Sequence, residues 1–405
     1  MLSHIRVAAL AALMIVAGAV DAGAASYRQL YAFLGGHDGA YPISNMVEVG
    51  GTLYGVTGSG GAGASSGTLF SVDPGTGAEK ILHTFGAKVD GVFPWGGLIA
   101  VDGVLYGTTT EGGQFSLGGW SCGTVFSFDT ATGTYSVVHS FDGSDGMFPI
   151  GSLINVGDEL YGTTQEGANF EGDNCIVGCG SVFSVDRKTQ DFKTLHEFNG
   201  DKGGYFPASG LVQIGGKLYG TTQAGNGLHT GAIYSVNLHT SHEKTVLEFY
   251  GLEGPNQPVG GMVEVDGLLY GTTYQGGGGM GCYNNQFGCG TIFTVNPKTG
   301  DASVAYAFQG GHDGQFLRSN LTNVGGILYG TTSFGGACRE NRLVGCGTVF
   351  RFDPKTGKKV TVYAFRGGKD GARPRAGLIN VDGTLYGVTE EGGPANYGTV
   401  FAVTP

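Results

Sequence analysis

The sequence predicts an all-β fold, a seven-bladed β-propeller with four antiparallel strands in each blade. Three observations support this prediction. A short motif recurs seven times, each copy lies in a unit of four short apolar runs, and the chain begins with the strand that its last unit lacks. The N-terminal strand would therefore complete the last blade and close the ring.

The repeat is marked by the tripeptide Leu-Tyr-Gly. It occurs at residues 53–55, 105–107, 160–162, 218–220, 269–271, 328–330 and 385–387. Successive copies are 51 to 59 residues apart. Self-similarity at such a period is typical of solenoids, propellers and other repeat arrays.

The unit at residues 97–149 shows the pattern inside one repeat. Runs rich in β-branched and aromatic residues at 98–101, 105–109, 124–128 and 135–141 predict four strands, with no helical period between them. Asp102-Gly103 supplies the residue types that a tight hairpin requires between the first two strands. A lone four-stranded sheet has two apolar faces to bury, and stacking such sheets around an axis buries both. The pattern therefore favours a propeller.

The two ends of the chain support a closed ring. The last unit stops after its third strand, residues 399–403, and has no fourth strand. Residues 27–33 match the fourth-strand pattern of residues 360–365. A linear solenoid would gain nothing from this offset, whereas a ring gains a latch and loses its exposed edges.

The repeat resembles a known family. Leu-Tyr-Gly-Thr-Thr, then Gly-Gly, then Gly-Thr-Val-Phe and Asp-Pro-x-Thr-Gly resemble the GloVer tandem repeat of exported bacterial proteins, here at 162–164, 347–350 and 353–357. The resemblance covers nearly the whole expected mature chain, and the unit also looks more loosely like a kelch-type blade. It implies the fold and export; the family has no assigned activity, so it implies no function.

The first 25 residues have the pattern of a signal peptide. Arg6 precedes an apolar run at residues 7–20, and Ala22–Ala24 forms an A-x-A cleavage site. An uncleaved membrane anchor is the alternative, but the run is shorter than the ~20 residues that a spanning helix needs. We expect a single propeller domain at residues 26–405, monomeric and without a membrane span. It would be secreted, periplasmic or on the cell surface after cleavage near Ala24.

Composition argues against some partners. The chain of 405 residues has a formal net charge of -11, 14% charged residues and 80 glycines. Nucleic-acid binding requires clustered Lys and Arg, and an anionic membrane surface repels an acidic protein. We therefore expect neither partner.

All seven cysteines lie in the loops between the second and third strands. Three loops hold two each, which predicts the disulfides Cys175–Cys179, Cys282–Cys289 and Cys338–Cys346 in an oxidising compartment. Metal binding is the alternative, but no His lies at ligand spacing beside them. Cys122 has no partner in its loop and is expected to be a buried, inert thiol or, alternatively, an intermolecular link.

Acidic and histidine positions recur with the repeat. The crossovers between blades contain Asp-Gly elements at Asp38, Asp90, Asp145, Asp313 and Asp370. These residues could form an acidic ring that binds calcium, but a repeated turn in which Asp bonds its own backbone is the simpler interpretation, and no cofactor is expected. His83, His139 and His196 occupy a strand position that holds Tyr in other blades, which indicates packing rather than catalysis.

Residues that break the repeat are better candidates for a ligand site. The loops between strands two and three emerge on the same face as the crossovers, and variation concentrates there. Seven of the ten arginines lie between 318 and 375. The candidate ligand-binding residues on this face are Arg318, Arg339, Arg342, Arg373, Arg375, Trp95 and Trp120. Arginines can bind a carboxylate or sulfate group, and tryptophans can stack on a sugar ring. Alternatively, the arginines keep the surface soluble and the tryptophans fill gaps between blades.

No catalytic motif is present: the sequence contains no nucleophile elbow, phosphate loop, HExxH or EF-hand loop. We expect a non-catalytic module that binds an extracellular glycan or a surface protein through the loop-rich face. The alternative is a polysaccharide lyase or hydrolase on a propeller scaffold. Tyr283, His229 and the arginines supply residue types that a lyase would need, and no residue is assigned as catalytic.

Overall fold

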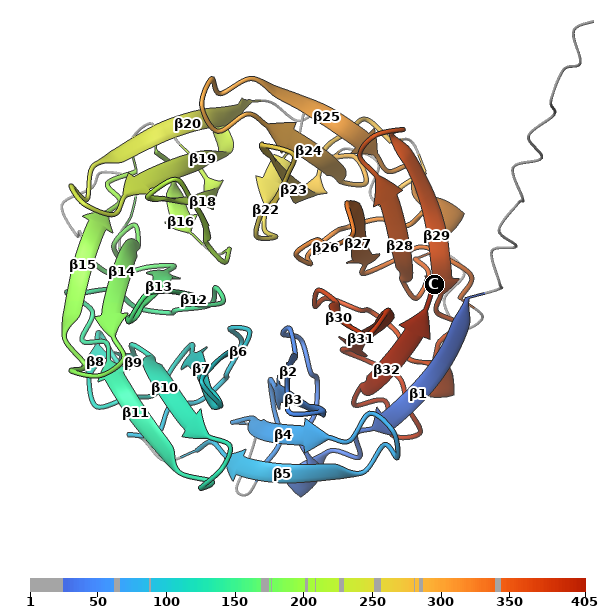
Figure 1. Cartoon of the computed structure of the whole chain (residues 1–405), viewed down its shortest axis with the longest axis horizontal. Helices are drawn as coiled ribbons and strands as arrows, with labels where there is room; N and C mark the ends of the chain where they lie inside the picture. The colour runs from blue at the N-terminus through green and yellow to red at the C-terminus, as the bar shows by residue number, and fades with distance from the viewer. Residues whose placement is uncertain are drawn as a thin grey trace, which may run out of the picture.

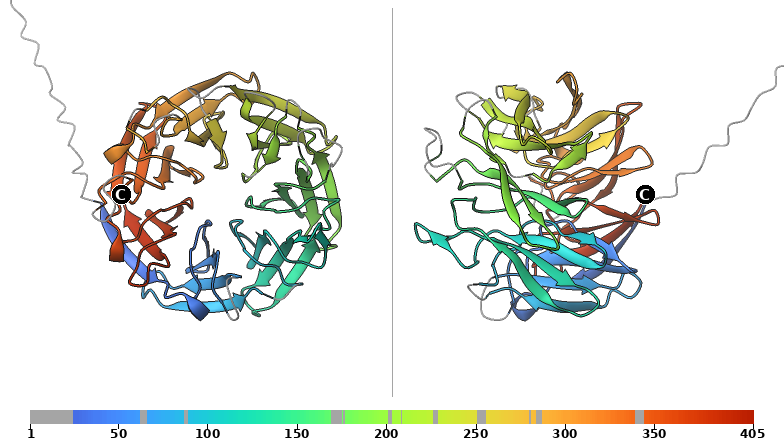
Figure 2. Two further views of the ribbon diagram at one scale, coloured as in Figure 1. Left: turned by 180° about the vertical axis from the view of Figure 1, so that it is seen from behind. Right: turned by 60° about the vertical axis from the view of Figure 1, so that its left-hand side comes forward.

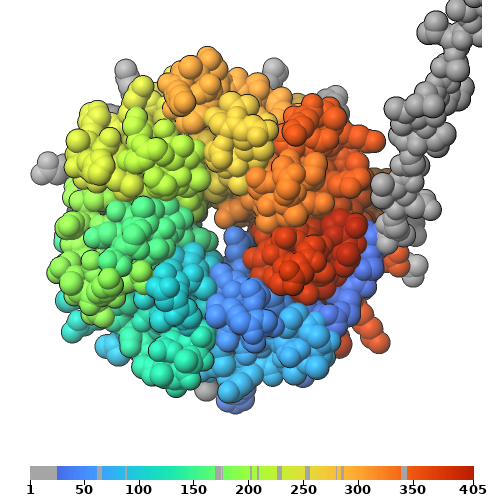
Figure 3. All heavy atoms as spheres, in the orientation of Figure 1, coloured from blue at the N-terminus to red at the C-terminus, as the bar shows by residue number. Residues whose placement is uncertain are grey.

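A computed structural model shows seven β-sheets arranged as blades around a central axis, which confirms the predicted seven-bladed propeller (Figure 1). It describes residues 25–61, 66–86, 89–168, 175, 177–200, 203–207, 209–225, 229–250, 256–279, 281–283, 287–338 and 344–405. The expected signal peptide lies almost wholly outside these residues. The space-filling view shows an opening at the centre of the ring (Figure 3).

Each blade contains four antiparallel strands, counted from the axis outward. The innermost strands of blades 1 to 7 are β2 (Val47–Val49), β6 (Ile99–Val101), β12 (Ile154–Val156), β17 (Val212–Ile214), β22 (Val263–Val265), β26 (Thr322–Val324) and β30 (Ile379–Val381). The second strands are β3 (Thr52–Thr57), β7 (Val104–Thr109), β13 (Glu159–Thr164), β18 (Lys217–Ala224), β23 (Leu268–Gln275), β27 (Ile327–Thr332) and β31 (Thr384–Thr389). The third strands are β4 (Thr68–Val72), β10 (Thr124–Asp129), β14 (Ser181–Asp186), β19 (His229–Asn237), β24 (Thr291–Val295), β28 (Thr348–Asp353) and β32 (Thr399–Thr404). The outermost strands are β5 (Glu79–Thr84), β11 (Tyr135–Ser140), β15 (Phe192–Glu197), β20 (Glu243–Tyr250), β25 (Ala302–Ala307), β29 (Lys358–Ala364) and, for blade 7, β1 (Ser26–Ala32).

Some elements lie outside this four-strand pattern. The crossovers contribute β16 (Tyr205–Pro207) and β21 (Asn256–Pro258), which pair with the second strands of blades 4 and 5. Three crossovers contain short 3₁₀ turns, η1 (Gly36–Asp38), η2 (Gly311–Asp313) and η3 (Gly368–Asp370). A hairpin of β8 (Ser116–Leu117) and β9 (Trp120–Ser121) projects from blade 2 (Figure 2).

The Leu-Tyr-Gly motif builds the core between blades. Its leucine is buried in every blade, and Leu160 of blade 3 packs in one cluster with Phe183 of its own blade and Tyr106 and Val125 of blade 2. Such contacts bury the facing surfaces of neighbouring sheets, where each fully buried large side chain contributes about 1.5–3 kcal/mol. The motif is therefore first a packing motif.

The threonine at the end of the second strand is buried, and its hydroxyl group has a hydrogen-bond partner on the third strand. Thr109 lies 2.8 Å from the Thr124 hydroxyl of the third strand, and Thr332 lies 2.8 Å from Thr348. The same hydroxyl pair recurs in blades 1, 3, 5 and 7. Because a buried hydroxyl is costly without a hydrogen-bond partner, this pairing explains why six blades keep a hydroxyl at both positions, with Ser181 in place of Thr in blade 3. Blade 4 has Ala232 at the third-strand position.

The N-terminal strand closes the ring as predicted. β1 pairs antiparallel with β32, from Ser26 opposite Thr404 to Ala32 opposite Thr399. The Tyr27 ring stacks on Tyr363 of blade 6 with centroids 4.3 Å apart, and its hydroxyl donates to the carbonyl of Asp370. Figure 1 shows β1 beside β32, at the rim between blades 6 and 1.

The three predicted disulfides are present, within the loops of blades 3, 5 and 6. Cys122 is the free cysteine among the described residues and is fully buried. Disulfides fit an oxidising compartment outside the cytoplasm. Among the described residues, no helix is long and apolar enough to cross a membrane.

Glu79 near the closure provides a pH-dependent prediction. Burial and the nearby Asp38 carboxylate raise the pKa of Glu79 to about 7, although a hydrogen bond with Tyr31 opposes the shift. Since the folded state holds the proton more tightly than the unfolded state, stability should fall as pH rises from about 4.5 to about 7. We expect Glu79→Gln to flatten this decline, so that the variant exceeds the parent in urea midpoint at pH 8 but not at pH 4. Glu197→Gln, at an exposed position, is the control and should leave the pH profile unchanged.

Candidate functional site at the channel mouth

The loop-rich face is held together by one unusual residue per crossover. In each crossover a non-glycine residue has a φ between 54° and 61°: Tyr41, Phe93, Phe148, Phe206, Gln257, Phe316 and Arg373. Side chains other than glycine adopt this conformation at a cost, so surrounding contacts must enforce it. These seven positions therefore mark a repeated structural constraint.

The constraint is a clasp between neighbouring blades. The N–H of Phe148 donates to the Cys122 carbonyl of blade 2, while its carbonyl accepts from Gln165 of blade 3. Arg373 makes the same two bonds, to Cys346 of blade 6 and from Glu390 of blade 7. Tyr41, Phe93 and Phe316 make the same two bonds, so the clasp fixes these crossovers against the loops of two blades.

A second ring of equivalent residues surrounds the mouth of the channel. It comprises the residues two positions after each clasp residue, of which those lining a small central hollow are Ile43, Trp95, Ile150, Val259, Arg318 and Arg375. The hollow measures about 100 Å³ and is floored by serines and asparagines, among them Ser319 and Asn320. Blades 6 and 7, which are adjacent, thus place arginine where the other four place an apolar side chain.

Three arginines converge beside this hollow. The Arg318 guanidinium lies over the Tyr274 ring of blade 5, 4.3 Å from its centroid. Arg373 lies 5.1 Å from the Phe334 ring centroid and donates to Glu391 at 2.5 Å. Among the described residues, Arg318 forms no ion pair, so its donors remain available to a ligand.

Arg375 is the most enclosed of the three. Its Nε lies 2.8 Å from Glu390 Oε2, but neither atom has a partner with hydrogen-bond geometry among the described residues, so the contact is between charges only. Burial lowers the pKa of Arg375, Glu390 opposes this shift, and Arg318 and Arg373 add to it. Burial also raises the pKa of Glu390, against the effect of Arg375. Three arginines therefore lie close together here, and the two neighbouring glutamates do not fully balance their positive charge.

The structure brings together only part of the predicted ligand-binding set. Arg318, Arg375 and Trp95 line the central hollow, and Arg373 adjoins Arg375. Trp120 lies instead on the β8–β9 hairpin. Arg339 and Arg342 lie outside the described residues.

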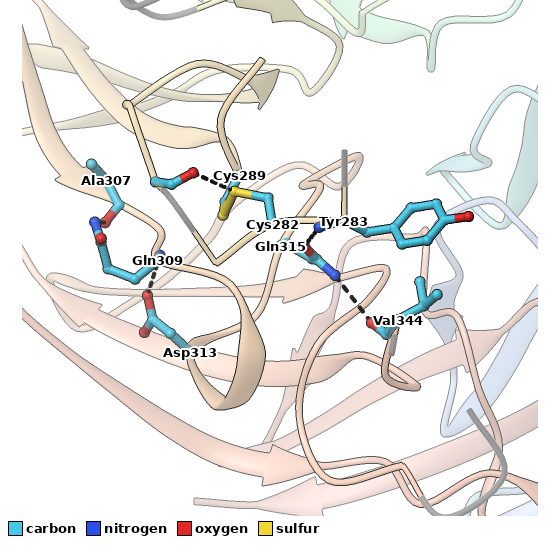
Figure 4. Close-up of a disulfide and its surroundings, with 9 residues drawn as sticks. Cys282, Tyr283, Cys289, Ala307, Gln309, Asp313, Gln315 and Val344 are labelled. Carbon is cyan, nitrogen blue, oxygen red and sulfur yellow. Dashed lines mark hydrogen bonds between the residues drawn. A yellow bond between two sulfur atoms is a disulfide. The ribbon is translucent and has the colours of Figure 1, made fainter. Parts of the chain in front are cut away.

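Of the two residues named with the arginines for a lyase, the structure describes the side chain of Tyr283. Tyr283 is exposed on the blade 5 loop, where its N–H donates to the Gln315 side chain, which in turn donates to the Val344 carbonyl of blade 6 (Figure 4). The side chain of His229 lies outside the described residues. Sequence reasoning missed Tyr274, Glu390 and Glu391, although Tyr274 and Glu390 occupy one repeat position, the first after the paired threonine.

The crossover aspartates bind groups of the neighbouring outermost strands rather than one another, and Asp313 also forms an ion pair with Lys359 of blade 6 at 2.9 Å. Asp38, Asp313 and Asp370 accept from tyrosines of the outermost strands, and Asp90 and Asp145 contact His83 and His139 there. Several also accept from a backbone N–H of the same turn. Within the described part of the chain, no group of three or more His, Cys, Asp or Glu residues could hold a metal ion. The geometry is that of a repeated turn.

His196 follows the same packing pattern. Burial lowers its pKa to about 4, with a smaller effect of His242 in the same direction. Its ring lies edge-on to Phe198 at 4.8 Å. A histidine that stays neutral among apolar groups contributes packing here.

The sequence pattern called the Gloeobacter/Verrucomicrobia repeat matches residues 18–173, 119–283 and 279–405. The chain belongs to this family. No curated protein matches the sequence of this Gloeobacter/Verrucomicrobia repeat protein.

Solved structures share the fold of this Gloeobacter/Verrucomicrobia repeat protein. An oligogalacturonate lyase from Vibrio parahaemolyticus is similar at a TM-score of 0.57 and 12% identity, covering 94% of this chain and 97% of that one. An oligogalacturonate lyase in complex with manganese is similar at a TM-score of 0.55 and 13% identity, covering 91% and 89%. Identity this low shows a shared fold alone.

Proposed function

We propose that this propeller is an exported, non-catalytic binding module that takes an acidic glycan at the mouth of its channel. The observation that carries the proposal is the replacement of apolar residues by Arg318 and Arg375 in two adjacent blades. A residue type that recurs at one position of every blade serves the structure of the blade. Where two neighbouring blades carry a different residue type at that position, the new side chains are candidates for binding a ligand.

The electrostatics support an anionic ligand. Arg318 has no carboxylate partner among the described residues, and burial with neighbouring arginines lowers the pKa of Arg375. A carboxylate or sulfate bound between them would offset this repulsion through charge-assisted hydrogen bonds, each contributing about 1.5–3 kcal/mol. The acidic surface elsewhere would favour this one place for an anion.

The size of the hollow limits what enters it. A volume of about 100 Å³ admits one acidic group, while the rest of a chain-like ligand would lie across the loop face. Trp95 lines the same hollow and is 44% exposed, so its ring is accessible to a sugar. An acidic group beside an aromatic surface is the arrangement that a uronate-containing glycan fits.

Oligogalacturonate is a suitable probe because each of its sugars carries a carboxylate. We expect Arg318→Gln combined with Arg375→Gln to weaken its binding at least about tenfold, as measured by titration calorimetry. The methyl-esterified oligomer, which lacks the charges, should bind the parent as weakly as the variant. Arg351→Gln, an exposed arginine on β28, is the matched control and should bind normally.

Other outcomes would overturn parts of the proposal. Equal binding of the acid and its methyl ester would exclude recognition of the carboxylate. Absorbance from unsaturated products, lost in the Arg318→Gln variant, would support the alternative of a lyase. Absence of glycan binding together with retention of a surface protein would instead favour a protein partner.

A further inference from the structure

A second hollow lies on the loop face between blades 2 and 3. It measures about 740 Å³ and is lined by Leu117, Trp120, Met147, Phe148, Glu166 and Val177. Three of its apolar side chains are unusually exposed for their type: Trp120 at 60%, Leu117 at 39% and Val177 at 41%. Exposed apolar surface gathered in one concave place is typical of a binding site.

The hollow exists because the chain departs from its repeat. Leu117 and Trp120 belong to the β8–β9 hairpin, and within the described residues blade 2 alone has such a hairpin in this loop. A repeated structural need therefore does not explain these side chains. The hairpin supplies one wall, and the crossover with the loop of blade 3 supplies the others.

The other walls are firmly held. Met147 and Glu166 exchange both backbone hydrogen bonds, at 2.8 and 3.0 Å, and the clasp fixes Phe148. Val177 accepts a hydrogen bond from Gly167 and lies between Cys175 and Cys179, which form a disulfide. A site built on fixed walls loses little entropy when a ligand binds.

Blade 7 shows one way in which a glutamate at the Glu166 position is paired. The backbone of Glu391 pairs with that of Ala372, as the backbone of Glu166 pairs with that of Met147. The Glu391 carboxylate also accepts a hydrogen bond from the guanidinium of Arg373, the neighbouring clasp residue. In blade 3 the clasp residue is Phe148, which carries no charge. Among the described residues, the Glu166 carboxylate forms no ion pair and accepts no side-chain or backbone hydrogen bond, and burial raises its pKa.

The aromatic rings complete the arrangement. Trp120 and Phe148 stand nearly perpendicular, at 85°, with centroids 6.5 Å apart, and so form two walls of a corner. The faces of aromatic rings attract cations, most strongly where water is excluded. A carboxylate, two rings at right angles and aliphatic neighbours together match a positive charge that carries apolar substituents.

We propose that this hollow is a binding site for an organic ammonium ion, with Glu166 as its counter-ion and Trp120 and Phe148 as its aromatic walls. The site is separate from the channel mouth and does not depend on the function proposed there. An anion would meet Glu166 unfavourably. A neutral apolar ligand would leave that carboxylate without a partner.

Choline and its neutral isostere 3,3-dimethylbutan-1-ol form a matched pair of probes, because they differ in charge but hardly in shape. Binding can be followed by tryptophan fluorescence in a Trp95→Phe background, where Trp120 is the remaining tryptophan. We expect choline to bind at least about tenfold more tightly than the alcohol. Glu166→Gln should remove this difference, and Trp120→Leu should weaken both ligands when measured by NMR line broadening.

Blade 2 offers a control within the same chain. Phe93 and Glu111 repeat the clasp residue and its glutamate, but the preceding loop of blade 1 has no hairpin among its described residues. Glu111→Gln should therefore leave choline binding unchanged. Unchanged melting temperatures will show that the variants fold. Equal affinities for choline and the alcohol, binding of neither, or equal effects of Glu111→Gln and Glu166→Gln would overturn the proposal.

Discussion

Deletion of residues 26–33 is expected to abolish the stable monomer. Without β1, the third strand of blade 7 becomes an exposed edge, and the six paired positions from Ser26 to Ala32 are lost. Phe33, which is fully buried in the core between blades 7 and 1, and the stacked Tyr27 are lost with it. At about 1.5–3 kcal/mol for a fully buried large side chain, Phe33 and the half-buried Tyr27 together contribute several kcal/mol, which is a large share of the roughly 5–15 kcal/mol stability of a domain. An open edge strand also promotes pairing with other chains.

The measurement is size-exclusion chromatography with light scattering, together with thermal unfolding. We expect the deletion variant to be unfolded or oligomeric. A circular permutant supplies the control: because Ser26 lies opposite Thr404, a short turn copied from Asp353–Gly357 can join the old termini, with new ends in the crossover after Phe33. This permutant should be a stable monomer. A deletion variant that remains monomeric with an unchanged melting temperature would contradict the closure mechanism.

Much of the fold could be predicted because its determinants are local and repeated. The sequence itself shows the glycine and aspartate turns, the Leu-Tyr-Gly strand and the displaced N-terminal strand. The extra strands β16 and β21 were not predicted, since they form by pairing of a crossover with the second strand of the same blade. The left-handed conformation of Phe93 and Phe148 was also hidden, because phenylalanine is not a residue type that indicates positive φ.

The candidate site was predictable only in part. Arg318 and Arg375 are one repeat apart in the sequence, so they occupy equivalent positions in adjacent blades and both line the hollow at the mouth. Tyr274 and Glu390 lie beside them because a crossover contacts the loops of two blades, and this offset cannot be read from sequence alone. Trp120 was grouped with them only because it lies on the same face; the β8–β9 hairpin carries it to a different hollow.

Gly162→Ala is expected to destabilise the protein strongly although it adds only one methyl group. A Cβ at Gly162 would lie 2.5 Å from Phe183 Cζ and 2.7 Å from Leu153 Cδ2, both in a fully buried core. The same glycine faces an aromatic ring of the third strand in every blade, Tyr234 in blade 4 and Phe in the others. Overpacking a core typically costs about 1–3 kcal/mol, which exceeds the roughly 0.4–1 kcal/mol that replacing a strand glycine by alanine gains. We therefore expect about 2 kcal/mol of destabilisation by urea unfolding.

The cause can be isolated with a second substitution. Phe183→Leu removes the ring atoms nearest to the new Cβ, so the double variant should be at least about 1 kcal/mol more stable than the sum of the single effects predicts. Gly75→Ala, in an exposed turn with an ordinary backbone conformation, is the control and should change stability by less than about 0.5 kcal/mol. If the two effects simply add, the glycine is not required by the ring. The third residue of Leu-Tyr-Gly would then need another explanation, such as close approach of the backbones during folding.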